Sequence, residues 1–477
     1  MRRDAPIRGE EPRGRGRRRL LWVVVLLALA LGALVTLRAG GRPAVEIRPA
    51  VAALGKATPV VFAAAEPARG LVRVTAELVQ GDDVRLLHEA SFSPRPPWAF
   101  WGERQARVQL ELPVGSEHVE GLTSGEATLR LSAWPARTWL RRPGPAVAER
   151  TLPVKLSPPS VQVISTFHYV GQGGSEVVVY RVGEGAVRDG VQAGEAFFPG
   201  RPLPGADPQR RLALFAVPWD LADQSRIRLI AEDEVENRAE VAFVDRFTPK
   251  PPATDTIRLD DRFLAKVVPE ILGQTPGLED RGDLLANYLQ INGELRQRNA
   301  GELVELARRS PDGFYWTEPF LQMPNSQVMS AFADRRTYVY GDETVDQQTH
   351  LGFDLATVER DPVPAANRGK VVLARFFGIY GNAVVIDHGG GLMSLYGHLS
   401  SIAVEEGQMV ERGALLGHTG ATGLAGGDHL HFTMLVDGVA VTPVEWWDDH
   451  WIEDRIRRKL EGMWPTAQAI GTPGSPR

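Results

Sequence analysis

The stretch GGDHLHFTMLV, residues 426–436, decides how the C-terminal part of the chain folds. Its polar residues His429, His431 and Thr433 alternate with apolar residues, and this period of two predicts a half-buried β-strand. Because residues i and i+2 of a strand point to the same face, both imidazoles are expected to face one place. On an α-helix the two side chains would diverge by about 200°. The pattern therefore predicts a strand that brings two histidines to a single site.

Composition limits the chemistry of that site. The chain has 477 residues, too many for one ordinary domain, and its 43% apolar and 24% charged residues are typical of folded domains. It has no cysteine, so disulfides, thiolate metal sites and cysteine nucleophiles are excluded. Any metal must therefore be bound by histidine, aspartate or glutamate.

The N-terminus predicts a membrane anchor. Residues 1–19 carry eight arginines and three acidic residues, a charge of about +5, and residues 20–37 (LLWVVVLLALALGALVTL) are uncharged. Eighteen helical residues span roughly 27 Å, close to the thickness of a hydrocarbon core. The positive-inside rule then makes residues 1–19 a cytoplasmic tail and places the rest outside the cytoplasm, most simply on an inner membrane facing a periplasm. The alternative is a cleaved signal peptide, although no small-x-small site follows the run.

The remaining chain divides by pattern into a multi-domain, mainly β protein. The net charge of −5 leaves about −10 after the basic tail, which gives no electrostatic case for nucleic-acid binding. Short alternating stretches predict two immunoglobulin-like β-sandwiches, which are possible surfaces for protein partners. After them, the sequence predicts a helical segment, then a Gly-rich domain of β-strands, and finally an amphipathic closing helix. The predicted ranges are residues 43–157 and 158–248 (sandwiches), 255–322 (helical segment), 323–450 (small antiparallel-β domain) and 451–477 (closing helix and disordered tail).

Seven of the ten histidines lie between His350 and His450. Within this span QTHLGFDLA contains His350 and Asp354, which alternate with apolar residues and therefore favour extended chain. In a straight strand their Cα atoms would lie roughly 13 Å apart. A bend or bulge at Gly352 would bring both side chains to one ion.

These residues match the donors of a catalytic zinc site. His350, Asp354 and one histidine of the HLH pair supply three protein ligands and leave a fourth position for water. The other histidine of the pair and His398 (in YGHLS) are then free for proton transfer and for stabilising an oxyanion.

HLGFDLA, YGHLS and HLHF, in this order, resemble the three motifs of the lysostaphin-like (LytM-type) zinc endopeptidases, family twenty-three of the metallopeptidases. The resemblance covers roughly residues 327–447. It implies one Zn²⁺ bound by His350, Asp354 and His431, with His398 and His429 as catalytic histidines. The family motif before HLH usually ends in Gly-Pro, whereas this chain has Gly427-Asp428.

The resemblance implies a zinc endopeptidase that hydrolyses peptide cross-links of peptidoglycan. A non-catalytic regulator that activates other wall hydrolases, and an adhesive protein with a vestigial enzyme domain, are the alternatives. The helical segment, residues 255–322, lies just before the catalytic domain, which leads to the hypothesis that it folds across the groove and inhibits the enzyme.

Overall fold

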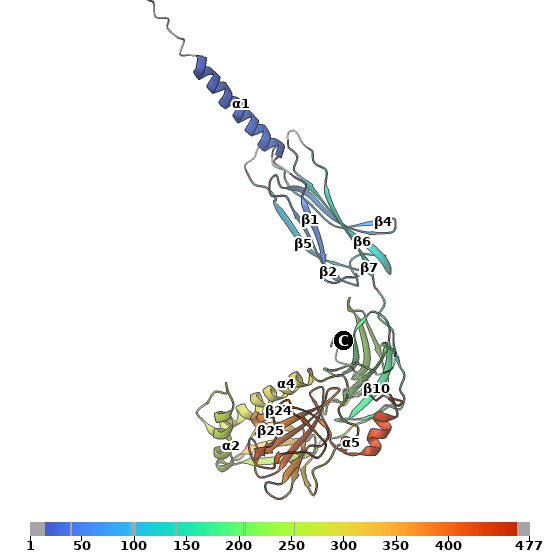
Figure 1. The fold of residues 1–477 in the computed structure, drawn as a ribbon, viewed down its shortest axis with the longest axis vertical. Coiled ribbons are helices and arrows are strands. Elements are labelled where there is room, and N and C mark those ends of the chain that lie inside the picture. Colours follow the sequence, from blue (N-terminus) through green and yellow to red (C-terminus); the bar gives the residue numbers. More distant parts are fainter. Residues whose placement is uncertain are drawn as a thin grey trace, which may run out of the picture. The chain divides into compact units, whose positions relative to one another are not determined.

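The alternating stretches form β-strands through most of the chain in the computed structural model (Figure 1). The structure describes residues 15–38, 41–94, 96, 102–138, 142–203, 205, 207–251 and 253–464. Residues 1–14 of the predicted basic tail and residues 465–477 of the predicted disordered tail lie outside the described residues. The chain divides into two compact units, an N-terminal unit that ends at Pro158 and also takes in Glu234–Asn237, and a C-terminal unit with the rest.

The uncharged run near the N-terminus forms the helix α1 (Arg15–Arg38). Its apolar side chains from Leu20 to Leu27, and again at Leu29 and Leu31, are exposed. Among the residues that the structure describes, no helix has the length and hydropathy expected of a membrane span. The anchor therefore stays a prediction.

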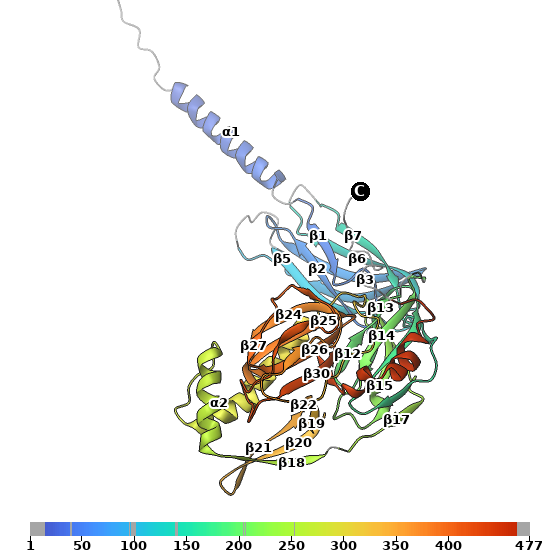
Figure 2. The ribbon, with the colours of Figure 1, turned by 60° about the horizontal axis from the view of Figure 1, so that its bottom comes forward.

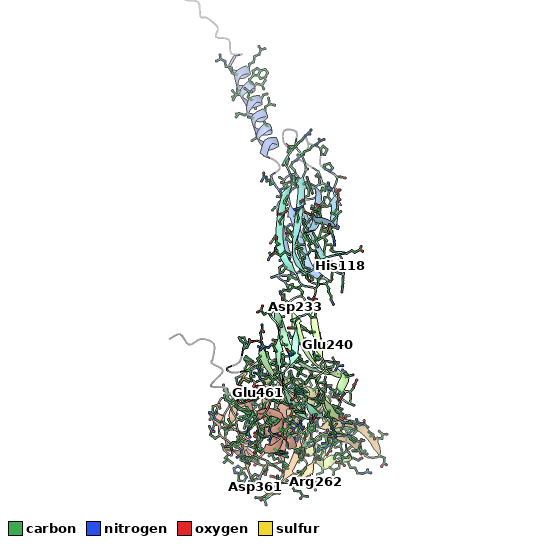
Figure 3. All side chains as sticks on the ribbon, turned by 90° about the vertical axis from the view of Figure 1, so that its right-hand side faces the viewer. His118, Asp233, Glu240, Arg262, Asp361 and Glu461 are labelled. Atoms are coloured by element: carbon green, nitrogen blue, oxygen red, sulfur yellow. The ribbon has the colours of Figure 1, made fainter. Side chains whose placement is uncertain are left out.

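The rest of the N-terminal unit consists of two antiparallel sheets that share one apolar core, with Phe62 and Leu129 among its fully buried residues. His118, which the sequence places far from the histidine motifs, lies in a turn of this unit (Figure 3). The sheets are ordered β1-β2-β5 and β4-β3-β6-β7. The strands are β1 (Ala44–Pro49), β2 (Thr58–Ala65), β3 (Leu71–Gln80), β4 (Asp83–Ser91), β5 (Arg107–Val114), β6 (Gly125–Pro135) and β7 (Ala146–Val154).

The C-terminal unit begins with a second pair of sheets, ordered β13-β14-β10-β8 and β12-β11-β15-β16, beside a parallel pair β9-β17. Both regions are thus paired β-sheets, and an immunoglobulin-like topology stays a prediction. The strands are β8 (Val161–Val163), β9 (Tyr169–Gly171), β10 (Ser175–Val182), β11 (Ala186–Ala193), β12 (Ala196–Pro199), β13 (Arg201–Pro202), β14 (Arg210–Ala216), β15 (Ile227–Asp233), β16 (Arg238–Val241) and β17 (Arg246–Thr248).

The helical segment contains α2 (Asp261–Gln274), α3 (Leu284–Gln290), a π-helical turn (Ile291–Leu295) and α4 (Arg296–Ala307). Asp260 and Asp283 cap α2 and α3, since each carboxylate accepts a hydrogen bond from a backbone N–H three residues on. A strand, β18 (Thr254–Leu259), precedes α2 and pairs in parallel with β20 (Asp334–Tyr340). Figure 2 shows these helices at one side of the strands that follow.

The last region is built on one large, mainly antiparallel sheet, ordered β19-β22-β30-β26-β25-β24-β28, with β31 beside β30. The predicted closing helix is instead three short pieces, α5 (Val444–Trp447), α6 (Asp449–Ile452) and a π turn (Glu453–Arg457). The remaining strands are β19 (Gln327–Ser330), β21 (Glu343–His350), β22 (Phe353–Ala356), β23 (Pro362–Pro364), β24 (Gly369–Phe376), β25 (Asn382–Gly389), β26 (Leu392–Leu399), β27 (Ser401–Ile402), β28 (Met409–Val410), β29 (Leu415–His418), β30 (Leu430–Val436) and β31 (Val439–Val441).

Candidate metal centre

Strand pairing brings the three sequence motifs together. β21 ends at His350, the chain bends at Gly352, and β22 then pairs with β30 so that Asp354 lies opposite His431. On the other side of β30, Gly397 of β26 lies opposite His431, which places His398 beside the same point. The three motifs therefore meet across neighbouring strands, although His431 lies 81 positions after His350 in the chain.

The atoms of one histidine–aspartate–histidine group converge. His350 Nε2 and His431 Nδ1 each lie 3.0 Å from Asp354 Oδ1, and they lie 3.1 Å from each other. One ligand atom from each residue falls within 4.8 Å of the others, and both histidines are buried. This is the set of residues that the resemblance assigns to zinc.

Hydrogen bonds fix which nitrogen of each imidazole faces the centre. His350 Nδ1 donates to the carbonyl of Ala331 over 3.1 Å, which leaves Nε2 with a lone pair. The Thr433 hydroxyl donates to the Leu351 carbonyl over 2.8 Å, so it accepts from His431 Nε2 over 3.0 Å. His431 Nδ1 is therefore the unprotonated nitrogen that faces Asp354.

The donor set fits a divalent cation. Two imidazole lone pairs and a carboxylate oxygen repel one another at about 3 Å unless a positive charge lies between them. Neutral histidine nitrogens and a carboxylate without cysteine are ligands that Zn²⁺ accepts. The second nitrogen of each histidine already has an acceptor, as in metal sites whose outer hydrogen bonds orient the ligands.

Asp354 is held as a carboxylate. Its Oδ1 lies 3.0 Å from His350 Nε2, 3.0 Å from His431 Nδ1 and 3.5 Å from His429 Nε2. Its second oxygen, Oδ2, accepts a hydrogen bond from the Arg336 guanidinium over 2.9 Å. Arg336 therefore leaves only Oδ1 to face the candidate metal position. The sequence analysis did not identify Arg336.

His398 and His429 lie beside this group without joining it. Their ring centroids are 4.9 Å apart, and His429 Nε2 lies 3.5 Å from Asp354 Oδ1. Each donates from Nδ1 to a backbone carbonyl, His398 to Thr422 over 2.8 Å and His429 to Gly427 over 2.9 Å. The Nδ1 hydrogen bonds thus leave Nε2 of each ring for other contacts, which for His429 include Asp354.

The environments of these two histidines differ. Burial, with the charge of His429, holds the pKa of His398 well below its usual value. Burial also lowers the pKa of His429, but the hydrogen bond and charge of Asp354 outweigh it and raise that pKa overall. His398 has a positive φ of 63°, a conformation that costs a non-glycine residue of order 1–3 kcal/mol and is found most often at functional sites.

The five residues line a cavity of about 360 Å³. The histidines, Asp354, Arg336 and Tyr380 line it, and the ring centroid of Tyr380 lies 5.4 Å from that of His431. β18 and the helical segment also line it, with Arg258, Tyr288 and Arg296 among their residues. The helical segment thus borders the candidate site. Inhibition of the enzyme by this segment stays a prediction.

The other histidines of the motif region lie apart from this group. His388 is fully buried, with Nδ1 donating to the Arg368 carbonyl over 2.8 Å and Nε2 2.7 Å from the Ser394 hydroxyl. Burial lowers its pKa to about 4. His418 contacts the Ser401 hydroxyl and His450 is exposed. We infer structural or surface positions for these three.

Comparisons with known proteins agree with the geometry. Residues 348–443 match the model of peptidase family M23. Peptidoglycan DD-endopeptidase ShyA of Vibrio cholerae is 31% identical over 198 residues, which cover 40% of this chain and 43% of that protein. DD-carboxypeptidase/endopeptidase Mpg of Neisseria meningitidis is 40% identical over 95 residues, or 20% of this chain and 22% of that protein.

A relative that is named as an activator, not as a peptidase, is also similar. Murein hydrolase activator EnvC of Escherichia coli is 32% identical over 126 residues, which cover 26% of this chain and 30% of that protein. This chain therefore matches less than half the length of each of these curated relatives. The range that the family model matches includes the strands β22, β26 and β30 of the candidate metal centre, and the chain accordingly contains a peptidase family M23 domain over residues 348–443.

Proposed function

We propose that the protein is a zinc-dependent endopeptidase that hydrolyses peptide cross-links of peptidoglycan. The observation that carries this proposal is the convergence of His350, Asp354 and His431 with two further histidines on one side of them. The names of two relatives, the peptidoglycan DD-endopeptidases ShyA and ShyB of Vibrio cholerae, support peptidoglycan as the substrate class.

His350 Nε2, Asp354 Oδ1 and His431 Nδ1 would hold the zinc ion. When bound, zinc supplies Lewis acidity, which polarises a carbonyl and lowers the pKa of a coordinated water towards 7. Because Asp354 Oδ2 is bound to Arg336, the carboxylate offers one oxygen to the ion. A fourth position then stays open to water or substrate, as catalysis requires.

His398 and His429 would handle protons and charge around the scissile amide. Each Nδ1 is bound to a backbone carbonyl, which leaves each Nε2 for proton transfer, and that of His429 lies 3.5 Å from Asp354 Oδ1. One imidazole orients the attacking water and accepts its proton, while the other donates a hydrogen bond to the oxygen of the tetrahedral intermediate. The departing amine receives the proton, which completes hydrolysis.

The full chain loaded with zinc tests this proposal. We expect it to convert purified cross-linked muropeptide dimers to monomers, followed by chromatography, and we expect a chelator to stop the conversion. His429→Ala should lower the rate at least about 100-fold, the lower range for loss of a general acid or base. Zinc-loaded protein that leaves several types of cross-link intact would contradict the proposal.

An activator role is the second candidate, because the murein hydrolase activator EnvC is 32% identical over 126 residues. The presence of all five histidine and aspartate residues favours catalysis. Stimulation of a partner hydrolase by the His429→Ala variant would favour the activator. For localisation, we propose that residues 20–37 anchor the protein in the inner membrane with the peptidase outside the cytoplasm, which fractionation of intact cells tests.

A further inference from the structure

The cavity that contains the candidate metal centre also contains two arginines. Arg258 from β18 and Arg296 from the start of α4 line it together with His398, His429 and His431. Both arginines precede the M23 domain in the chain. Neither belongs to a sequence motif.

A π-helical turn sets the position of Arg296. Helix α3 passes into the π turn Ile291–Leu295, and Arg296 is the first residue after it. Such turns widen one helical turn and are often found at functional sites. Here the turn carries Asn292, which is fully buried although its side chain is polar.

Asn292 links Arg296 to the body of the domain. The Arg296 guanidinium donates to the Asn292 side-chain oxygen over 2.6 Å and to its backbone carbonyl over 3.1 Å. The Asn292 amide nitrogen donates in turn to Asp346 Oδ2 over 2.7 Å. This chain of hydrogen bonds fixes the guanidinium with neutral acceptors and leaves its charge without an adjoining carboxylate.

Some charged side chains of the cavity form ion pairs and others do not. Within the residues that the structure describes, neither Arg258 nor Arg296 forms an ion pair, whereas Arg336 is bound to Asp354. The two other carboxylates of the cavity are engaged with backbone N–H groups, Asp255 with Thr256 and Asp260 with Phe263. Arg258 and Arg296 are therefore guanidinium groups of the cavity without an ion-pair partner among the described residues, and the anionic side chains of Asp255 and Asp260 line the same cavity.

Arg296 shares its cavity with residues of the candidate metal centre. Tyr380 and His431 line the same cavity. The Tyr380 ring in turn contacts His431. A ligand group beside Arg296 would thus lie in the same cavity as the reacting bond.

We propose that Arg296 and Arg258 form a carboxylate subsite that binds a free carboxylate of the peptide substrate next to the metal centre. This inference rests on the proposed function, since it names the part of the substrate that Arg258 and Arg296 recognise. Guanidinium and carboxylate match in geometry and form paired, charge-assisted hydrogen bonds. An unlinked C-terminus of a cross-linked peptide supplies such a carboxylate.

The test compares two substrates and four proteins. The substrates are a purified cross-linked muropeptide dimer and the same dimer with its carboxylates amidated. The zinc-loaded proteins are the wild type, Arg296→Gln, Arg258→Gln and, as a control on the same helix, Arg298→Gln, whose exposed side chain donates a hydrogen bond to the Pro276 carbonyl.

We expect Arg296→Gln to raise KM for the free dimer about 10-fold or more, as for loss of a hydrogen bond between charged groups, with a smaller change in kcat. The amidated dimer should bind the wild type about as weakly, and Arg296→Gln should change its KM little. Arg298→Gln should match the wild type with both substrates. Arg258→Gln, on the exposed part of β18, repeats the test where folding is not at risk.

Two results would overturn the subsite. Equal losses with free and amidated dimers would mean that the arginines do not recognise a carboxylate. Faster hydrolysis by Arg296→Gln or Arg258→Gln would mean that the helical segment covers the site and inhibits it. If the wild type cleaves neither substrate, the proposed function fails, and calorimetric binding of the two dimers to wild type and Arg296→Gln still decides the subsite.

Discussion

Arg336 shows how one side chain outside the motifs can determine the metal centre. Its guanidinium binds Asp354 Oδ2 over 2.9 Å and the Ser330 hydroxyl over 2.8 Å. We expect Arg336→Gln to weaken zinc binding roughly 10–100-fold, as is typical when an outer hydrogen-bond partner of a metal ligand is lost. The reason is that Asp354 would lose both its fixed orientation and a charge that keeps it ionised. Competition with a chromogenic chelator measures the change.

The neighbouring Arg335 provides the matched control. It lies on the same strand, β20, but its side chain is exposed and forms no ion pair among the described residues. Arg335→Gln should bind zinc as the wild type does. Equal zinc affinities for the two variants would show that the Arg336 contact does not position Asp354.

At the scale of elements, the connection between β21 and β22 depends on Gly352, because a side chain has no room at this position. A Cβ atom at Gly352 would lie 2.6 Å from the His431 imidazole and 2.6 Å from the Thr433 hydroxyl oxygen. Gly352→Ala must therefore displace His431 and its bond to Thr433. We expect a loss of zinc affinity of roughly 10–100-fold. Gly301→Ala, in an open position on α4, is the control and should leave zinc binding unchanged. Undiminished zinc binding by Gly352→Ala would show that the close approach is not needed.

The same elements show which features the sequence could predict. The HLH strand and the bend at Gly352 were predictable because alternation and glycine act locally. Strand β18 was missed because its partner, β20, lies about 80 residues later and long-range pairing leaves no local pattern. Arg336 was missed for the same reason, since only the fold brings it to Asp354. The family resemblance supplied the choice of His431 over His429, which spacing alone left open.

At the scale of the molecule, polar contacts join the second β region to the short helices that follow the M23 domain. Lys459, near the C-terminal end of the described chain, pairs with Glu176 of β10 over 2.9 Å, and Glu176 is completely buried. Ser175 also donates two hydrogen bonds, of 2.8 and 2.9 Å, to the carboxylate of the half-buried Glu445 on α5. These contacts cross from the second pair of sheets to the helical turns after the peptidase sheet. We therefore expect the C-terminal unit to unfold in a single transition, separate from that of the N-terminal unit.

Removal of one partner should test this coupling. Lys459→Met leaves the Glu176 carboxylate buried without its cation, which typically costs about 3–5 kcal/mol and should lower the Tm of the C-terminal unit on the order of 5–10 °C. Differential scanning calorimetry should show no change in the N-terminal transition. Arg458→Met, at an exposed neighbouring position, should leave both transitions in place. The double variant Lys459→Met/Glu176→Leu should recover much of the loss, because an apolar pair avoids the cost of burying charge. Separate melting of the second β region and the peptidase sheet in the wild type would mean that these buried contacts do not make the two regions one cooperative unit.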